Sequence, residues 1–342
     1  MPAHRRSFLR LVARHRFVPG LCAALFMALA PASLPARDTS CTPAAACAES
    51  LTLTAGGYIR VYRSLPLTHN DTVVRAVLVI HGNARNADDY FDFATEAAGL
   101  EHKLAETLVL APNFRTRKDE PGRGEHYWSS HGWKIGNRSL DAARVSSFAV
   151  MDELLGRICP TGPAPFPNLR TVVIAGHSAG AQFVNRYLAG GAGCPNRRIE
   201  VRYIVMNPSS YLYVDDRRRA DPDGTFATPR AGCSGFDDYK YGLRELNTYM
   251  RRVGAAEIRR RMFTRSSWYL AGGADTRAGR SLDQRCEARL QGANRLVRHI
   301  NYRDYAGLFD AWTGALFVTV PGIGHSGRAM LVSEPARQAA FR

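Results

Sequence analysis

Lysine is scarce in this 342-residue chain, which has 4 lysines and 42 arginines among its 46 basic residues. Such a strong preference for arginine is typical of the codon usage of a GC-rich genome. The basic runs at 217–219 and 259–261 lack aromatic residues interleaved at regular spacing. The sequence therefore argues against a nucleic-acid-binding surface, and we expect no nucleic-acid partner.

Several other signals are missing. No apolar stretch reaches the ~20 residues that a membrane-spanning helix needs. There is no phosphate-binding loop or dinucleotide-binding glycine motif, and the histidines lack the spacing of metal ligands. No internal repeat or low-complexity linker divides the chain. We therefore expect no permanent membrane anchor, no cofactor and no metal, and a single domain over residues 33–342.

The first 32 residues differ in composition from the rest. They hold five arginines and no acidic residue, then a short apolar stretch at 21–30, then Ala30-Pro-Ala32. This order predicts a signal peptide that is cleaved after Ala32. Arg5-Arg6 also fits a twin-arginine signal, so both export routes stay open. Either route implies a periplasmic or extracellular protein, whose formal charge falls from +16 to +11 when the five arginines are removed.

The cysteines predict disulfide bonds. Cleavage removes Cys22 and leaves six cysteines, an even number that indicates three disulfides in an exported chain. Helices expected at 141–158 and 179–188 would end at the same edge of a parallel sheet if they packed on one of its faces. That placement brings Cys159 beside Cys194. The other two expected pairs are Cys41–Cys47 and Cys233–Cys286.

Apolar strands alternate with helices along most of the chain. This alternation predicts a doubly wound, mostly parallel sheet. An alternating segment at 51–63, which contains Gly56-Gly57, predicts a hairpin ahead of that sheet. Residues 209–265 contain no clear core strand, and we expect them to form an insertion beside the functional edge. The expected strands of the sheet are 73–80, 107–111, 171–175, 201–206, 268–271 and 315–320.

The segment Gly176-His-Ser-Ala-Gly180 lies where a strand of β-branched and small residues turns into a helix. Such a sharp turn leaves no room for side chains two residues before or after its central residue, so both glycines are sterically required. The turn lifts the hydroxyl group of Ser178 clear of the backbone. The motif therefore predicts Ser178 as a nucleophile.

These features resemble the α/β-hydrolase superfamily over most of the mature chain. That superfamily places its nucleophile, acid and histidine after successive later strands, in this order. Here Ser178, Asp275 and His325 each follow a predicted strand in the same order. The resemblance implies a triad in which His325 is the base and Asp275 orients it. Asp215 and Asp216 follow the preceding strand and are the alternative acids.

The resemblance also implies an oxyanion hole built from two backbone N–H groups. The first belongs to Ala179, directly after the nucleophile. The segment His81-Gly82-Asn83 is similar to the superfamily's His-Gly-x loop, which implies Asn83 as the second donor and Ala84 as the near alternative. We expect His81 and His177 to make structural hydrogen bonds rather than to act as bases.

Tyr127, Trp128 and Trp133 lie in a long loop that follows a strand end. Aromatic residues in such a loop either line a substrate pocket or cap the core, and both alternatives stay open. The same alternatives apply to the tyrosines of the insertion. We take Tyr127, Trp128 and Trp133 as candidates for substrate binding.

The resemblance implies an exported serine hydrolase that cleaves carboxylic esters through an acyl-enzyme and needs no cofactor. Within the superfamily, the chain is most similar in its features to secreted esterases and polyester depolymerases, so the expected substrate is a small or polymeric ester. This part of the prediction is analogy at the level of the fold. A secreted serine peptidase of the same fold is the enzyme alternative. A catalytically silent binding protein is the alternative from another functional class.

Overall fold

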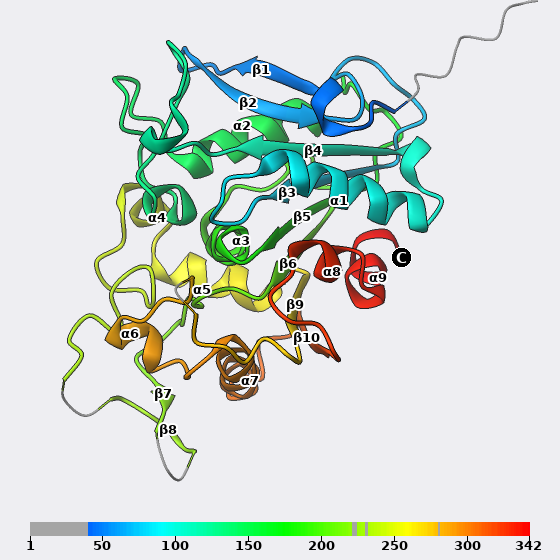
Figure 1. Cartoon of the computed structure of the whole chain (residues 1–342). Helices are drawn as coiled ribbons and strands as arrows, with labels where there is room; N and C mark the ends of the chain where they lie inside the picture. The colour runs from blue at the N-terminus through cyan, green and yellow to red at the C-terminus, as the bar shows by residue number, and fades with distance from the viewer. Residues whose placement is uncertain (1–39, 221–223, 230–231, 280) are drawn as a thin grey trace, which may run out of the picture. The chain divides into compact units, whose positions relative to one another are not determined.

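A mostly parallel sheet of eight strands forms the centre of the protein. The computed structural model describes residues 40–220, 224–229, 232–279 and 281–342, so the expected signal peptide lies outside the described residues (Figure 1). The strand order is β1-β2-β4-β3-β5-β6-β9-β10. The strands are β1 (Ala48–Thr52), β2 (Tyr58–Arg63), β3 (Arg75–Ile80), β4 (Thr107–Asn113), β5 (Thr171–His177), β6 (Glu200–Met206), β9 (Ser267–Gly272) and β10 (Ala315–Val320).

The expected hairpin is formed by β1 and β2, which pair antiparallel with each other, and β2 pairs antiparallel with β4. Every pairing from β4 to β10 is parallel. This arrangement confirms the predicted α/β class.

Helices cover both faces of the sheet (Figure 1). In β3, Leu78 and Ile80 belong to one apolar core, whereas Val77 and Val79 belong to the other. Because both faces are buried there, the central strands β3 and β5 are apolar at most positions. The first core holds α2 (Ser147–Ile158), α3 (Ala179–Gly190), α5 (Ala255–Thr264) and α7 (Arg295–Ala306). The second holds α1 (Ala87–Leu100), α8 (Gly327–Leu331) and α9 (Glu334–Phe341).

Helix α2 begins six residues later than the sequence predicts, at Ser147 rather than Asp141. The reason is a cap: the hydroxyl oxygen of Ser146 accepts a hydrogen bond from the backbone N–H of Phe148 at 3.1 Å, which satisfies a donor that the helix itself leaves free. The end of α2 agrees with the prediction, and α2 and α3 pack on the same face. Cys159 directly follows α2 and is bonded to Cys194, as expected.

The other two predicted disulfides, Cys41–Cys47 and Cys233–Cys286, are also present. All three pairings are therefore confirmed. Three disulfides fit an oxidising compartment.

Residues 209–265 add no strand to the eight-stranded sheet among the described residues. They contain a two-stranded ribbon, β7 (Arg218–Arg219) and β8 (Phe226–Ala227), followed by α4 (Thr248–Val253) and α5. Helix α5 buries Ile258 and Met262 in the same core as α3. The last part of this segment therefore completes the crossover from β6 to β9, and its first residues, 209–214, are buried as well.

Candidate active site

Four polar residues follow four neighbouring parallel strands. Ser178 comes directly after β5, Asn207 after β6, Asp275 shortly after β9, and His325 in the loop after β10. The carboxyl ends of parallel strands meet at one edge of a sheet, where ligands bind in open α/β folds. The topology therefore gathers these four residues at one place.

Ser178 occupies a strained backbone conformation, with φ of 58° and ψ of −111°, between β5 and α3. Its backbone N–H donates to the carbonyl oxygen of Met206 at 2.9 Å, which ties the turn to β6. A methyl group on Gly176 would lie 2.5 Å from the carbonyl of Gly180, and one on Gly180 would overlap the carbonyl oxygen of Ile80. The two glycines are therefore sterically required, as the motif predicts.

Ser178, His325 and Asp275 form a chain of hydrogen bonds. The Ser178 Oγ lies 2.9 Å from His325 Nε2, and His325 Nδ1 lies 2.7 Å from Asp275 Oδ2. We assign a proton to His325 Nδ1, because a carboxylate can only accept. Nδ1 then donates to Asp275, and Nε2 is free to accept from the Ser178 hydroxyl.

Asp275 is 3 % exposed and is held by two residues besides His325. Asn207 Nδ2 donates to Asp275 Oδ2 at 2.5 Å, and Arg295 Nη1 lies 3.6 Å from Asp275 Oδ1. Burial opposes ionisation, but the hydrogen bonds from His325 and Asn207 and the charge of Arg295 hold the pKa of Asp275 below its usual value. The carboxylate is therefore charged at neutral pH.

Asp215 has other partners. It accepts hydrogen bonds from Tyr305 Oη at 2.8 Å and from Arg217 Nε at 2.8 Å. Of the acids weighed from the sequence, Asp275 is therefore the one whose carboxylate contacts His325.

The sequence reasoning missed Asn207 and Arg295. Asn207 directly follows β6, so the rule that found Ser178 and Asp275 would also have found it. Arg295 is the first residue of α7 and reaches Asp275 from a different element. No local pattern marks such an arginine.

The expected oxyanion residues Asn83 and Ala179 both line the cavity at Ser178. His81 secures the loop that carries Asn83, since its Nδ1 donates to the carbonyl oxygen of Gly82 at 2.9 Å and its Nε2 accepts from the N–H of Phe114 at 2.9 Å. Complete burial lowers the pKa of His81 to about 4, so the ring is neutral. These contacts agree with the structural part expected of His81.

Tyr90 lies beneath the same loop and joins it to the nucleophile turn. Its hydroxyl group is 2.9 Å from His177 Nδ1, and a methyl group on Gly82 would lie 2.8 Å from that hydroxyl. Burial and the neighbouring His325 lower the pKa of His177 well below its usual value. Position 82 is thus kept small by Tyr90, and His177 is a neutral ring packed beside His325 with ring centroids 4.6 Å apart.

The expectation that Trp128 and Trp133 bind substrate is wrong, because both side chains are completely buried in the core. Trp133 stacks on Phe114 at 6.0 Å and contacts His81 at 4.7 Å, so it supports the Asn83 loop from below. Tyr127 does not line the cavity at Ser178 either, and its ring lies under the guanidinium group of Arg117.

The tyrosines of the insertion also belong mainly to the core. Tyr211, Tyr213 and Tyr241 are buried, and the partly buried Tyr239 packs against the same core and donates from its hydroxyl group to the carbonyl oxygen of Ile135 at 2.7 Å. For these residues the core alternative holds.

The cavity at Ser178 has a volume of about 440 Å³, and most of the residues that line it are polar or charged. Its nucleophile end is formed by Ser178, Ala179 and Asn83. The charged groups around it come from a short 3₁₀ helix (Gly132–Ile135), from the insertion and from the loop before α6 (Cys286–Arg289). They are Lys134, Lys240, Asp283 and Arg285.

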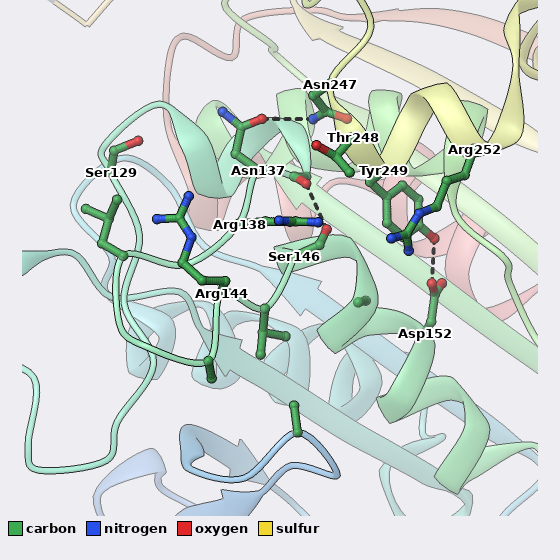
Figure 2. A pocket seen from close by; sticks show the side chains of 16 residues that line it. Ser129, Asn137, Arg138, Arg144, Ser146, Asp152, Asn247, Thr248, Tyr249 and Arg252 are labelled. Carbon is green, nitrogen blue, oxygen red and sulfur yellow. Dashed lines mark hydrogen bonds between the residues drawn. The ribbon is translucent and has the colours of Figure 1, made fainter.

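A larger cavity of about 810 Å³ lies between the loop before α2 and the start of α4 (Figure 2). Figure 2 shows Arg138, Arg144 and Arg252 around it. The hydroxyl group of Tyr249 donates a hydrogen bond to Asp152 Oδ2 at 2.5 Å. It shares no lining residue with the cavity at Ser178. Choosing a cavity by its volume alone would therefore miss the one that contains Ser178.

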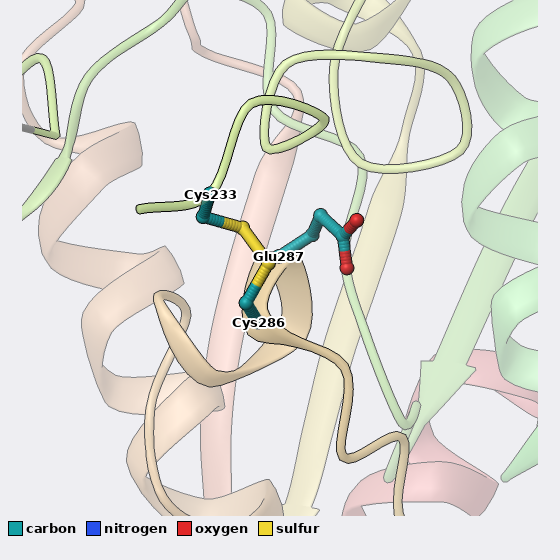
Figure 3. A group of neighbouring side chains, drawn as sticks. All are labelled: Cys233, Cys286 and Glu287. Carbon is teal, nitrogen blue, oxygen red and sulfur yellow. A yellow bond between two sulfur atoms is a disulfide. The ribbon is translucent and has the colours of Figure 1, made fainter. Parts of the chain in front are cut away.

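One group of possible metal ligands occurs among the described residues, formed by Cys233, Cys286 and Glu287 (Figure 3). The two sulfur atoms are bonded to each other and are therefore not thiolates. This group does not fit a metal ion. None of the helices in the described part of the chain has the length and apolar character that a membrane crossing requires.

Comparison with known proteins shows the family of the chain. The model of the alpha/beta hydrolase family matches residues 77–341. The chain belongs to this family. No curated protein matches its sequence.

Two solved structures of α/β hydrolases are similar in fold. Poly(aspartic acid) hydrolase-1 from Sphingomonas sp. KT-1 has a TM-score of 0.59 at 24 % identity, with 86 % of this chain and 99 % of that chain covered. LpqC, a poly(3-hydroxybutyrate) depolymerase from Bordetella parapertussis, has a TM-score of 0.58 at 23 % identity, with 83 % and 86 % covered. At such identities the similarity concerns the fold.

Proposed function

We propose that this α/β hydrolase is an exported serine esterase that works through an acyl-enzyme on Ser178. The observation that carries the proposal is the hydrogen-bonded chain from Ser178 through His325 to the ionised Asp275, at the edge of a 440 Å³ cavity. A serine hydroxyl is a weak nucleophile until a base takes its proton, and a neutral imidazole held by a carboxylate is such a base.

In the first half of the reaction, His325 Nε2 takes the proton from Ser178 Oγ while Oγ forms a bond to the carbonyl carbon of the ester. The carbonyl oxygen becomes an oxyanion, which accepts hydrogen bonds from the backbone N–H groups of Ala179 and Asn83. When the tetrahedral intermediate collapses, the alkoxide leaves and takes the proton from His325. Asp275 stabilises the charged imidazolium in between.

In the second half, water attacks the acyl group on Ser178 while His325 takes a proton from that water. Collapse of the second intermediate releases the carboxylic acid and returns the proton to Ser178. Every step uses the same three side chains and the same two backbone donors.

Ester rather than amide cleavage is the proposal, because an alkoxide leaves more readily than an amine. Two proteins of similar fold are described as a poly(3-hydroxybutyrate) depolymerase and a poly(aspartic acid) hydrolase. Both descriptions name polymers, which supports a polymeric ester as one possible class of substrate. Export is supported by the three disulfides and by the composition of residues 1–32.

The test is the hydrolysis of p-nitrophenyl esters from acetate to palmitate, measured beside a polyester film and a peptide p-nitroanilide. We expect ester turnover that the Ser178→Ala variant loses. Cleavage of the anilide in preference to all esters would favour a peptidase. Folded protein with no turnover of any substrate would favour a silent binding protein.

A further inference from the structure

Two of the chain's four lysines line the cavity at Ser178. Lys134 belongs to the 3₁₀ helix Gly132–Ile135, and Lys240 lies in the loop before α4. Arg285 also lines the cavity, and Asp283 is its one carboxylate among the described residues. The lining thus carries three cationic side chains and one anionic side chain.

The two lysines differ in their partners. Lys240 is buried, and its Nζ lies 2.7 Å from Asp283 Oδ2. Lys134 Nζ donates to the neutral amide oxygen of Asn83 at 2.8 Å, and among the described residues it forms no ion pair with a carboxylate. Asp283 is therefore used by Lys240, and the charge of Lys134 is left without a counter-ion in the cavity.

The walls that carry these charges are held in place by buried arginines. Arg186 donates from Nη2 to the backbone carbonyl of Lys240 at 2.9 Å, and Arg298 donates from Nη2 to the backbone carbonyl of Asp283 at 2.9 Å. The disulfide of Cys286 fixes the segment that follows Arg285. The backbone at Lys240 and Asp283 is thus held before any ligand arrives, which lowers the cost of ordering these walls on binding.

Lys134 is also partly withdrawn from water. Burial, together with the neighbouring Lys240, lowers its pKa to about 8, so the ammonium group is charged but poorly compensated at neutral pH. An ammonium group in this condition favours a bound anion. Its position beside Asn83, the expected oxyanion residue, puts that anion within the substrate cavity rather than on the outer surface.

We propose that the cavity at Ser178 recognises an anionic substrate, with Lys134 binding a carboxylate group that the substrate carries close to its scissile carbonyl. This inference rests on the proposed function and narrows its substrate class from esters in general to carboxylate-bearing esters. Lys134 is thus a specificity residue of the hydrolase.

The test uses two matched substrate pairs. In one pair the carboxylate lies on the acyl side: the p-nitrophenyl monoester of adipic acid and its methyl ester. In the other it lies on the leaving group: 4-acetoxybenzoate and its methyl ester. For each pair the measured quantity is the selectivity ratio, which is kcat/KM for the free acid divided by kcat/KM for the methyl ester. Comparing enzyme forms cancels the intrinsic reactivity of each substrate.

We expect Lys134→Met to lower the ratio of at least one pair by about tenfold or more, as for the loss of a charged hydrogen bond. Lys134→Arg keeps the charge and should retain most of the ratio. The matched control is Lys118→Met, which removes an exposed lysine outside the cavity and should leave the ratio unchanged. Lys134→Met also removes the contact with Asn83, but a weakened oxyanion hole lowers both rates of a pair and not their ratio.

Three outcomes decide the matter. A fall in the ratio for Lys134→Met alone supports the inference and shows on which side of the ester the carboxylate lies. Ratios that are the same in the unaltered protein and in Lys134→Met overturn the inference while leaving the proposed esterase function intact. Absence of turnover for all four substrates overturns the proposed function, and the inference with it.

Discussion

Two of the cavities of this hydrolase, the one in Figure 2 and the one at Ser178, differ in what surrounds them. The larger, of about 810 Å³, is lined by the loop before α2, by α2 itself and by α4, and no residue at the carboxyl ends of β5, β6, β9 or β10 reaches it. The smaller, of about 440 Å³, contains Ser178. The comparison teaches that the convergence of strand ends, rather than volume, locates the candidate chemistry.

Both cavities are basic, but their charges differ in kind. The larger presents arginines near the surface, such as Arg138 and Arg144. The smaller presents Lys134 beside the expected oxyanion residue Asn83, and Lys240 on a wall whose backbone a buried arginine holds. We therefore expect substitutions around the smaller cavity to change catalysis and specificity, and substitutions around the larger one to change neither.

The largest effect is expected from Ser178→Ala, which removes the nucleophile. We expect kcat for an ester to fall by about 10⁴-fold or more. Arg144→Gln in the larger cavity is the matched control and should leave kcat close to that of the unaltered protein. Steady-state kinetics on p-nitrophenyl butyrate measures both. If both variants lost kcat to the same extent, the cavity at Ser178 would not be distinguished from the larger one as the site of catalysis.

The next effect concerns the acid. Asp275→Asn replaces the carboxylate that holds His325 in its tautomer, and kcat should fall by about 10³- to 10⁴-fold. The same substitution at Asp152, which lines the larger cavity, and at Asp215 should have little effect on kcat. A large loss for Asp215→Asn with normal turnover for Asp275→Asn would move the acid to the loop after β6.

A third prediction concerns the turn that carries Ser178. Gly180→Ala would force a methyl group into the carbonyl oxygen of Ile80, so the free energy of unfolding should fall by about 3 kcal/mol or more. Gly156→Ala in α2 meets nothing within 4 Å and should be neutral or stabilising, by up to about 1 kcal/mol. Urea denaturation followed by circular dichroism compares the two variants, and equal stability would show that the turn has room for a side chain.

The smallest effect is the pH dependence of anion selectivity. Lysine is charged below its pKa, which for Lys134 is about 8, so the selectivity ratio should be constant near pH 7 and fall as the pH rises through about 8. Burial is the main cause of the lowered pKa of Lys134; among the charged groups, Lys240, Arg85 and Arg285 also lower it and Asp283 raises it. The Lys134→Met variant should lose most of this fall. A ratio that rises with pH would contradict the predicted sign.

The contacts among the candidate residues that the sequence anticipates are those set by local sterics and chain order. Gly176 and Gly180 mark the turn at Ser178, and the order of strands brings Asp275 and His325 to it. The disulfide Cys159–Cys194 follows in the same way, because two helices on one face end at one edge of the sheet.

The parts that the sequence does not predict depend on contacts between distant segments. Trp133 is buried because its ring packs against Phe114 and His81, which lie in other segments of the chain. Its position in a loop of the sequence therefore does not show whether its side chain is buried. The role proposed for Lys134 depends on its having no ion-pair partner within the described part of the chain. Whether a charged side chain has an ion-pair partner depends on the folded structure, and no sequence motif predicts it.

The most direct test of the central claim is labelling with a fluorophosphonate, which reacts with a serine only when a base activates it. The account predicts one label per molecule in the intact mass spectrum, mapped by peptide digestion to Ser178. The label should be absent from folded Ser178→Ala and strongly reduced in Asp275→Asn. A folded protein that takes no label, or a label retained in Ser178→Ala, would contradict the account.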